Sequence, residues 1–312
     1  MSKSHRTALT PAALRTRALK LIRQCRGTLL IAAVLLCLFS WAADAAELYG
    51  EHAVRQATER IFALYEERNP KPENPDELLQ WEQQQIVYAY FHADVSADAA
   101  RTPWRLLGLG LELSGFIFGA VVLLGLNRHL LSILRTGEPV PRYLLSGLPH
   151  AGRAIWLHLR IAACILGWSF LIVLLPYQAL SRLGVVGELI AAFVSIIVAL
   201  WAGYHYALAT LHLADDPQQI RSTTNYIDAG VADMSAFTLR SMLKTMWPVY
   251  GLHALELCMA LAAAYVPALT IPVRILGIPV SLISTAMHIV VLACLYETIH
   301  QDIPAPPAQP EA

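Results

Sequence analysis

Hydrophobic residues form long continuous blocks along this chain, rather than the short alternating runs of a water-soluble protein. Two of these blocks, 161–180 and 189–212, are separated by only a short joint. Each block reaches the roughly 20 residues that cross about 30 Å of hydrocarbon as a helix. The pattern therefore predicts a helical hairpin through a lipid bilayer.

The same criterion predicts an all-α, polytopic membrane helix bundle with about six transmembrane helices. Short surface helices and one extracytoplasmic helical hairpin are expected to connect them. The first block ends in small residues and can also be a signal peptide with a cleavage site, although its length favours an uncleaved signal anchor. The predicted spans are 27–46, 104–126, 161–180, 189–212, 247–266 and 275–296.

The charges between the blocks predict the topology. Segment 1–26 carries seven basic residues and no acid, and 127–160 carries five arginines against one acid. By contrast, 47–98 holds eleven acids and four bases. Because Lys and Arg are enriched on the cytoplasmic side, both termini are expected in the cytoplasm and 47–103 outside it. The remaining cytoplasmic parts are the loop 213–246 and the tail 297–312, which is proline-rich and expected to be disordered.

Amphipathic patterns predict helices outside the spans. In 1–26, Leu14, Ala18 and Leu21 share one helical face and the basic residues share the other. This segment is expected to lie along the anionic inner leaflet. In the loop 127–160, Leu130 and its neighbours predict a short helix on the inner membrane surface.

Two further helices are predicted in the acidic segment 47–103, on either side of a break between Pro70 and Pro75. We expect the apolar stripe of the second helix to dock within the protein itself, because amphipathic helices usually bury such a face locally; binding of a partner is the alternative. The stripe consists of Leu79, Gln83, Ile86 and Tyr90.

In the loop 213–246, another short helix is expected to end by Gly230.

Small residues in 104–126 predict a helix–helix contact. Gly108, Gly115 and Gly119 lie on one helical face, and small residues let another backbone approach closely in lipid. Glu112 shares this face and is expected to point into the bundle. An acid inside the membrane is a candidate for function; the competing interpretation is an acid that is protonated or hydrogen-bonded for assembly alone.

Histidines and a second acid complete the polar intramembrane candidates. His253 and Glu256 lie three residues apart and therefore on one face, where they can share a proton or hold a metal. His288 lies midway along the last span. His205 lies between two tyrosines near the inner interface and is expected to be an interfacial residue rather than a catalytic one. Because no HExxH, CxxC or phosphate-binding motif occurs, we predict no catalytic residue, no metal and no cofactor.

Composition agrees with a membrane protein. Hydrophobic residues make up 56% of the 312 residues and charged residues only 15%, and a soluble protein this apolar would expose large hydrophobic patches. Basic and acidic residues number 23 each, so a nucleic-acid partner is not indicated. The five cysteines lie in or beside the apolar blocks, where disulfides are not expected. The expected partners are membrane lipids and a protein bound through the outer hairpin or the cytoplasmic loops, with the oligomeric state left open.

Three stretches carry a family resemblance: Ile-Leu-Arg-Thr-Gly-Glu-Pro at 133–139, Leu-Leu-Pro at 174–176 and His-Leu-Ala-Asp-Asp-Pro at 212–217. In this order, across about 111–296, the chain resembles the YciC-like family of uncharacterised bacterial inner-membrane proteins. That family is related to the membrane domain that accompanies some glycerophosphodiester phosphodiesterases. The resemblance implies a six-helix fold, a bacterial inner-membrane location and an unspecified role in the envelope, and it supplies no catalytic residues.

Three functions follow as hypotheses. The first is a non-enzymatic component of envelope maintenance or of a membrane complex, favoured because enzyme motifs are missing and surface helices are expected on both faces. The second is a transporter of a small or lipidic substrate, and the third is an intramembrane metalloenzyme. Convergence of the polar residues around an open cavity would favour the second or third. Those residues are Glu112, His253, Glu256 and His288, and the metalloenzyme would also use His205.

Overall fold

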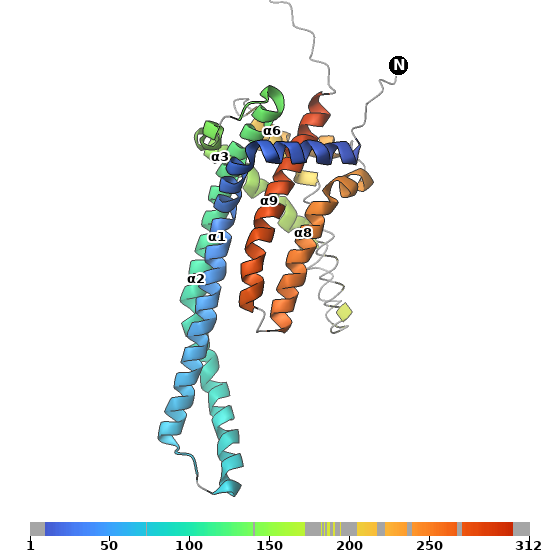
Figure 1. The fold of residues 1–312 in the computed structure, drawn as a ribbon. Coiled ribbons are helices and arrows are strands. Elements are labelled where there is room, and N and C mark those ends of the chain that lie inside the picture. The colour runs from blue at the N-terminus through green and yellow to red at the C-terminus, as the bar shows by residue number, and fades with distance from the viewer. Residues whose placement is uncertain are drawn as a thin grey trace, which may run out of the picture. The chain divides into compact units, whose positions relative to one another are not determined.

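The described part of the chain is 93% helical and contains no strand (Figure 1). The computed structural model describes residues 10–72, 74–139, 141–171, 205–216, 222–235, 239–266 and 270–301, with a few positions between 182 and 194. The helices are α1 (Pro11–Arg68), α2 (Pro75–Thr136), the 3₁₀ helix η1 (Pro141–His150), α3 (Ala151–Ser169), α6 (Ala209–Asp215), α7 (Thr223–Ser235), α8 (Leu239–Tyr265) and α9 (Thr270–Gln301).

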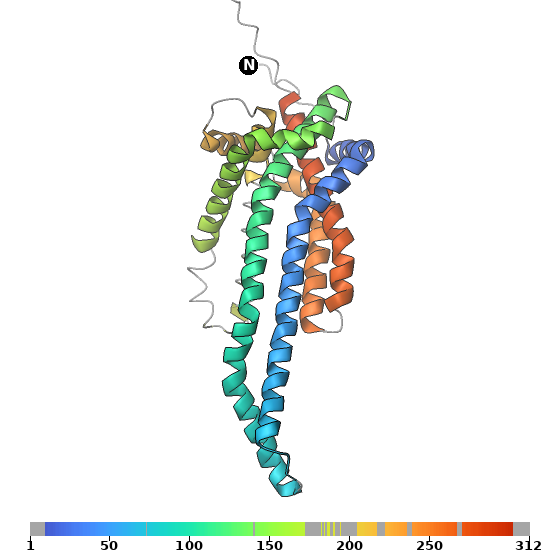
Figure 2. The same cartoon turned by 90° about the vertical axis from the view of Figure 1, so that its left-hand side faces the viewer.

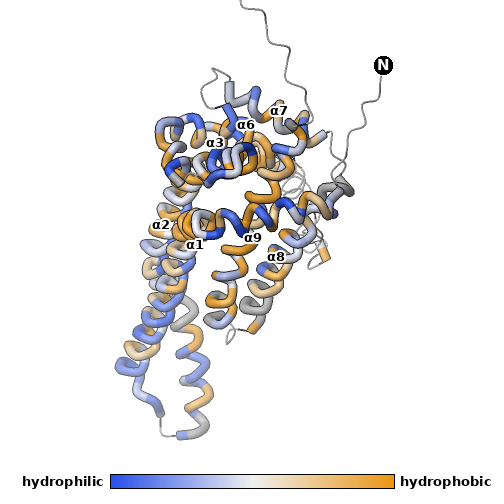
Figure 3. The backbone as a smooth tube through the Cα atoms, turned by 45° about the horizontal axis from the view of Figure 1, so that its top comes forward, coloured by the Kyte–Doolittle hydropathy of each residue, from blue (hydrophilic) through white to orange (hydrophobic). Residues whose placement is uncertain are grey.

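Three helical segments of the described residues are long and apolar enough to cross a membrane: Pro11–Arg68, Ser96–Thr136 and Ile275–His300. They contain the predicted first, second and last spans, and Figure 3 shows the strongly hydrophobic course of α9. The prediction of an all-helical fold is therefore confirmed for the described residues, and these three segments support the prediction of a membrane protein. Of the predicted third span only 161–171 is described, and of the fourth only 190, 194 and 205–212. The 174–176 stretch lies outside the described residues, so the count of six remains a prediction.

The chain folds into two compact units. The larger unit consists of Met1–Leu35 and Gly119–Ala312, and the smaller one of Leu36–Phe118. Within the larger unit, α8 and α9 follow one another and lie side by side (Figures 1 and 2). The second half of α9 forms the centre of this unit, because Val290, Ala293 and Cys294 are fully buried.

The first turns of α1 pack inside the larger unit. Arg17 donates a hydrogen bond from its guanidinium to the Oγ1 of Thr298 on α9, over 3.3 Å. The helix kinks at Cys25, whose backbone angles (φ −121°, ψ 26°) are not helical. The expected apolar face is thus covered by protein rather than by the inner leaflet. Its buried residues are Leu14, Ala18 and Leu21.

The end of α2 differs from the prediction. The expected surface helix around Leu130 is instead the last part of α2, and the Leu130 side chain is fully buried. No glycine or proline interrupts the chain between 126 and 136, so the helix continues. Gly137 then ends it with a φ of 78°, donating its N–H to the carbonyl oxygen of Ile133 over 2.8 Å. This left-handed cap is one that glycine adopts without a Cβ clash.

In the smaller unit, α1 and α2 form a helical hairpin, and the two helices run side by side (Figure 2). The break between them falls at 69–74, where the prolines are concentrated. At Gly115 the two helices approach closely: a Cβ there would lie 2.6 Å from the Cβ of Phe39. The Phe39 and Phe118 rings also pack together, with centroids 5.6 Å apart.

The buried face of the hairpin in 47–103 is not the predicted one. Leu79 and Ile86 are 65% and 64% exposed. The second helix instead turns Trp81 and Tyr88 toward Tyr65 of α1, with ring centroids 5.8 Å and 5.1 Å apart. Aromatic rings bury large apolar areas, which favours packing through this face. The expectation that this stripe docks within the protein itself is therefore wrong for Leu79, Gln83 and Ile86, and the side chain of Tyr90 lies outside the described ones.

Candidate functional site

A group of charged and aromatic side chains, the polar cluster, joins four helices of the larger unit. The members come from the end of α2, from α6, from the last turns of α7 and from the end of α9. They are connected by hydrogen bonds and ion pairs from one side of the group to the other. The polar cluster consists of Arg135, His212, Asp215, Asp233, Tyr296, Glu297 and His300.

Arg135 binds two carboxylates at once. Its Nη1 lies 2.5 Å from the Oδ1 of Asp215, and its Nε lies 3.0 Å from the Oε2 of Glu297. The Glu297 side chain is only 5% exposed, so its charge needs compensation, and Arg135 contributes to it. Burial raises the pKa of the Asp215 carboxyl, but the hydrogen bond and the charge of Arg135 lower it, and the resulting pKa is below the ordinary value. Asp215 is therefore ionised at neutral pH.

Tyr296 links Asp215 to the histidines of the polar cluster. Its hydroxyl donates a hydrogen bond to the Oδ2 of Asp215 over 3.0 Å and lies 3.4 Å from the Nδ1 of His212. Its ring stacks on that of His300, with centroids 4.1 Å apart and planes 24° apart. Because Tyr296 is almost fully buried, these contacts fix the position of both imidazoles.

Asp233 lies between two histidines. Its Oδ2 is 2.7 Å from the Nε2 of His212 and 3.5 Å from the Nε2 of His300. The Nδ1 of His300 lies 2.9 Å from the backbone carbonyl oxygen of Tyr296. Imidazole nitrogen and carboxylate oxygen are ligands that transition-metal ions accept, and these three ligand atoms lie within 4.8 Å of one another.

A close approach of α6 and α7 brings His212 and Asp233 together. A Cβ at Gly230 would lie 2.8 Å from the backbone nitrogen of Ala209, so only glycine permits this crossing without a shift. Asp233 follows Gly230 by three residues, and His212 follows Ala209 by three residues. Since positions three apart share a helical face, each functional side chain lies one turn beyond the crossing.

Three of the sequence-predicted residues lie together on α8 and α9. The Nδ1 of His253 is 2.9 Å from the Oε2 of Glu256, and the hydroxyl of Ser284 donates to the Oε1 of Glu256 over 3.2 Å. The His288 ring lies beside that of His253, with centroids 6.2 Å apart. The side chains of His253 and Glu256 are 45% and 27% exposed, so this pair lies at the protein surface.

The remaining predicted residues are elsewhere. Glu112 belongs to the smaller unit and is exposed there, although it was expected to point into the bundle. It lines a pocket of about 320 Å³ with Asp44, Arg101 and other residues of the hairpin. Gly108 lines the same pocket. His205 is half-buried, and Gly119 is half-buried at the start of the second segment of the larger unit.

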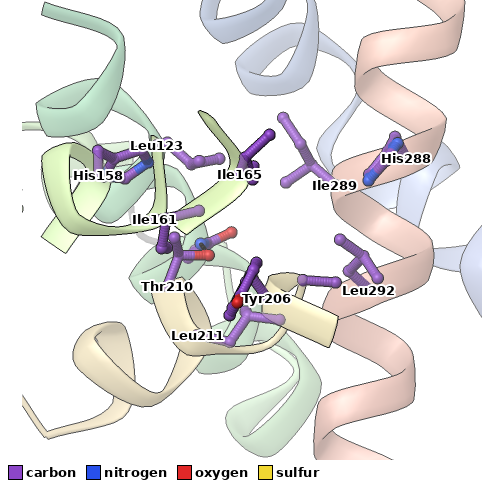
Figure 4. Close-up of a pocket in the computed structure, with 12 residues that line it drawn as sticks. Leu123, His158, Ile161, Ile165, Tyr206, Thr210, Leu211, His288, Ile289 and Leu292 are labelled. Carbon is purple, nitrogen blue, oxygen red and sulfur yellow. Dashed lines mark hydrogen bonds between the residues drawn. The ribbon is translucent and has the colours of Figure 1, made fainter. Parts of the chain in front are cut away.

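A second, mainly apolar pocket of about 240 Å³ lies inside the larger unit (Figure 4). His158 on α3 and His288 on α9 stand at opposite ends of it. The Nδ2 of Asn127 donates to the Oγ1 of Thr210 in its wall over 3.4 Å. The other lining residues are Leu123, Ile161, Ile165, Tyr206, Ala207, Leu211, Ile289 and Leu292.

Sequence reasoning did not single out the polar cluster as a site. A signal was present, because Arg135 lies in the stretch 133–139 and His212 and Asp215 lie in the stretch 212–217, both quoted for the family resemblance. These charged residues stand directly beside apolar blocks, where an unpaired charge is costly. Asp233 and His300 gave no local signal.

Comparison with protein-family models, with curated proteins and with solved structures finds no match to this chain. The membership of the YciC-like family therefore stays a prediction. The geometry of the helices and of their polar side chains carries the functional argument.

Proposed function

We propose that this protein is a multi-pass component of a bacterial inner membrane, serving envelope maintenance or a membrane complex without catalysing a reaction. In this proposal both termini face the cytoplasm, as the basic segments 1–26 and 127–160 indicate. The acidic hairpin then faces outward and binds a protein partner. The observation that carries the proposal is the exposed apolar stripe on that hairpin.

The hairpin is too long to be enclosed by the membrane. From the kink at Cys25, α1 continues to Arg68 as one helix. At 1.5 Å per residue, the part from 47 to 68 adds about 33 Å beyond the predicted first span. The corresponding part of α2 carries Leu79, Ile86 and Val87, which are 65%, 64% and 54% exposed. These side chains share one helical face and would be in water, where they favour association with another apolar surface.

The charge of the hairpin restricts what this face can bind. With eleven acids against four bases between 47 and 98, it repels a second copy of itself and attracts a basic surface. The partner that fits is an extracytoplasmic protein, or the outer part of another membrane protein, with an apolar patch surrounded by Lys and Arg.

The arrangement of the polar cluster supports a non-catalytic role. Arg135 is engaged by Asp215 and Glu297, and Tyr296 donates to Asp215. These bonds connect α2, α6 and α9, and a residue so engaged has few donors left for a substrate. The cluster acts in this proposal as a connection between helices.

Site-specific photo-crosslinking in cells tests the hairpin. A photoreactive amino acid at Ile86 is expected to give one adduct with a different protein. The same residue at Gln84, which is exposed two positions away on the opposite face, is the matched control and is expected to give none. Adducts of equal intensity at both positions, no adduct at Ile86, or an adduct only with a second copy would each contradict the proposal.

The pocket inside the larger unit favours a second function, transport of a small apolar or lipidic substrate. If the protein is a transporter, Ile165→Trp fills the pocket and is expected to abolish uptake of a fluorescent phospholipid by proteoliposomes. Ile31→Trp is the matched control, because Ile31 is 57% exposed on α1. No uptake by the unmodified protein, or equal uptake by both variants, counts against transport.

A further inference from the structure

The ligand atoms of His212, Asp233 and His300, the His–Asp–His group, are spaced as a metal site requires. A tetrahedral ion with bonds of 2.0–2.1 Å holds neighbouring ligand atoms about 3.3 Å apart. The two distances from the Oδ2 of Asp233 to the histidine Nε2 atoms, 2.7 Å and 3.5 Å, lie on either side of that value. All three ligand atoms lie within 4.8 Å of one another.

The backbone bond of His300 fixes which of its nitrogens carries a proton. Its Nδ1 lies 2.9 Å from the carbonyl oxygen of Tyr296, which can only accept, so Nδ1 must carry the hydrogen. In the neutral ring the Nε2 then presents a lone pair to the carboxylate of Asp233. Two acceptors facing one another repel unless a proton or a cation lies between them.

The same reasoning applies to His212. The Tyr296 hydroxyl gives its proton to Asp215, so it has none to give to the Nδ1 of His212 at 3.4 Å. In the tautomer whose Nδ1 donates to the phenol oxygen, the Nε2 turns a lone pair toward Asp233. Histidine ligands of metal ions show this arrangement, with one ring nitrogen held by a fixed partner and the other on the ion.

Protons alone do not satisfy both imidazole nitrogens that face the Asp233 carboxylate. One carboxylate faces both imidazoles, whose ring centroids are only 5.3 Å apart, so a proton between Asp233 and one ring leaves the lone pair of the other ring unsatisfied. A single divalent ion satisfies both lone pairs and the carboxylate together. The side chains of His212, Asp233 and His300 are 14%, 20% and 25% exposed, so the ion can enter from solvent and keep a water in its fourth position.

We propose that His212, Asp233 and His300 bind one divalent transition-metal ion of the zinc class at the junction of α6, α7 and α9. Two imidazoles and one carboxylate favour such an ion over magnesium or calcium, which prefer oxygen ligands throughout. The bound ion holds the three helices together beside the ion pairs of Arg135. This inference does not depend on the proposed hairpin partner, because the two involve separate residues.

Zinc binding by the full-length protein tests the site. The protein, purified in detergent without a polyhistidine tag and treated with a chelator, is dialysed against Zn²⁺ and its metal content measured. One zinc per chain is expected for the unmodified protein and for His52→Gln, a surface histidine on the outer hairpin. Asp233→Asn and His300→Gln are expected to lose at least tenfold in affinity. His300→Gln is the second variant in case Asp233→Asn does not fold. Because His300 is at the end of α9, its replacement is expected to leave the fold intact.

Cobalt supplies an independent readout. Co²⁺ in the unmodified protein is expected to give the intense visible absorption of a tetrahedral ion with nitrogen and oxygen ligands, and His300→Gln is expected to abolish it. Zinc is also expected to raise the Tm of the unmodified protein and of His52→Gln, but not of Asp233→Asn. Sub-stoichiometric zinc in the unmodified protein, equal binding by the variants, or only the weak spectrum of octahedral Co²⁺ would overturn the site.

Discussion

Replacing Arg135 with methionine is expected to lower the free energy of unfolding of the larger unit substantially. The change removes the guanidinium that pairs with Asp215 and Glu297, and the Glu297 side chain is 5% exposed. Removing one partner of a buried ion pair costs 3–5 kcal/mol, and since the Arg135 side chain is 41% exposed, we expect about 3 kcal/mol. A loss of this size lowers the Tm by roughly 6–12 °C in a unit of this size.

Thermal unfolding in detergent, followed by size-exclusion chromatography, measures this effect. Arg23→Met is the matched control, because Arg23 is exposed on α1, and its effect should stay within about 0.5 kcal/mol. A double-mutant cycle with Glu297→Gln separates the ion pair from lost packing, and a coupling of about 1 kcal/mol or more is expected. An Arg135→Met protein as stable as Arg23→Met, or fully additive single effects, would show that the ion pairs do not hold the helices together.

The helices that the sequence predicts best are those whose length is imposed by lipid. The blocks at 27–46, 104–126 and 275–296 lie within helices long and apolar enough to span a membrane. Hydrocarbon offers no hydrogen bonds to the backbone, so an apolar run of this length has one available conformation. Hydropathy does not predict where a helix ends beyond the apolar block. Accordingly, α2 continues to Thr136 through a segment that was expected to form a separate surface helix.

The polar cluster could not be assembled from sequence, because its contacts join distant parts of the chain. Arg135 and Glu297 are 162 positions apart, and Asp215 lies 80 positions after Arg135. One residue carried a misleading local signal. Gly230 was expected to end a helix, but α7 continues to Ser235, and the glycine is needed for the crossing with α6. A glycine indicates a helix end and a close packing contact equally well, and only the neighbouring backbone decides between them.

Replacing Gly147 with alanine is expected to cost about 3 kcal/mol, at the upper end of the range for overpacking. A Cβ at Gly147 would lie 2.3 Å from the carbonyl oxygen of Val121, and a Cβ at Gly125 would lie 2.1 Å from the carbonyl oxygen of Leu144. Here α2 and η1 touch backbone to backbone. No flexible side chain can move aside, so one of the two helices must shift.

Gly152, at the start of α3, is the matched control for Gly147 because a Cβ there would meet nothing within 4 Å. Gly152→Ala is expected to be neutral or to stabilise the protein by up to about 1 kcal/mol, since alanine is the better helix former. The same chemical change thus has opposite expected signs at two positions only five residues apart. If the Tm values of the two alanine variants were equal, the close crossing of α2 and η1 would not contribute to stability, and the burial of the end of α2 would have to rest on its side chains alone.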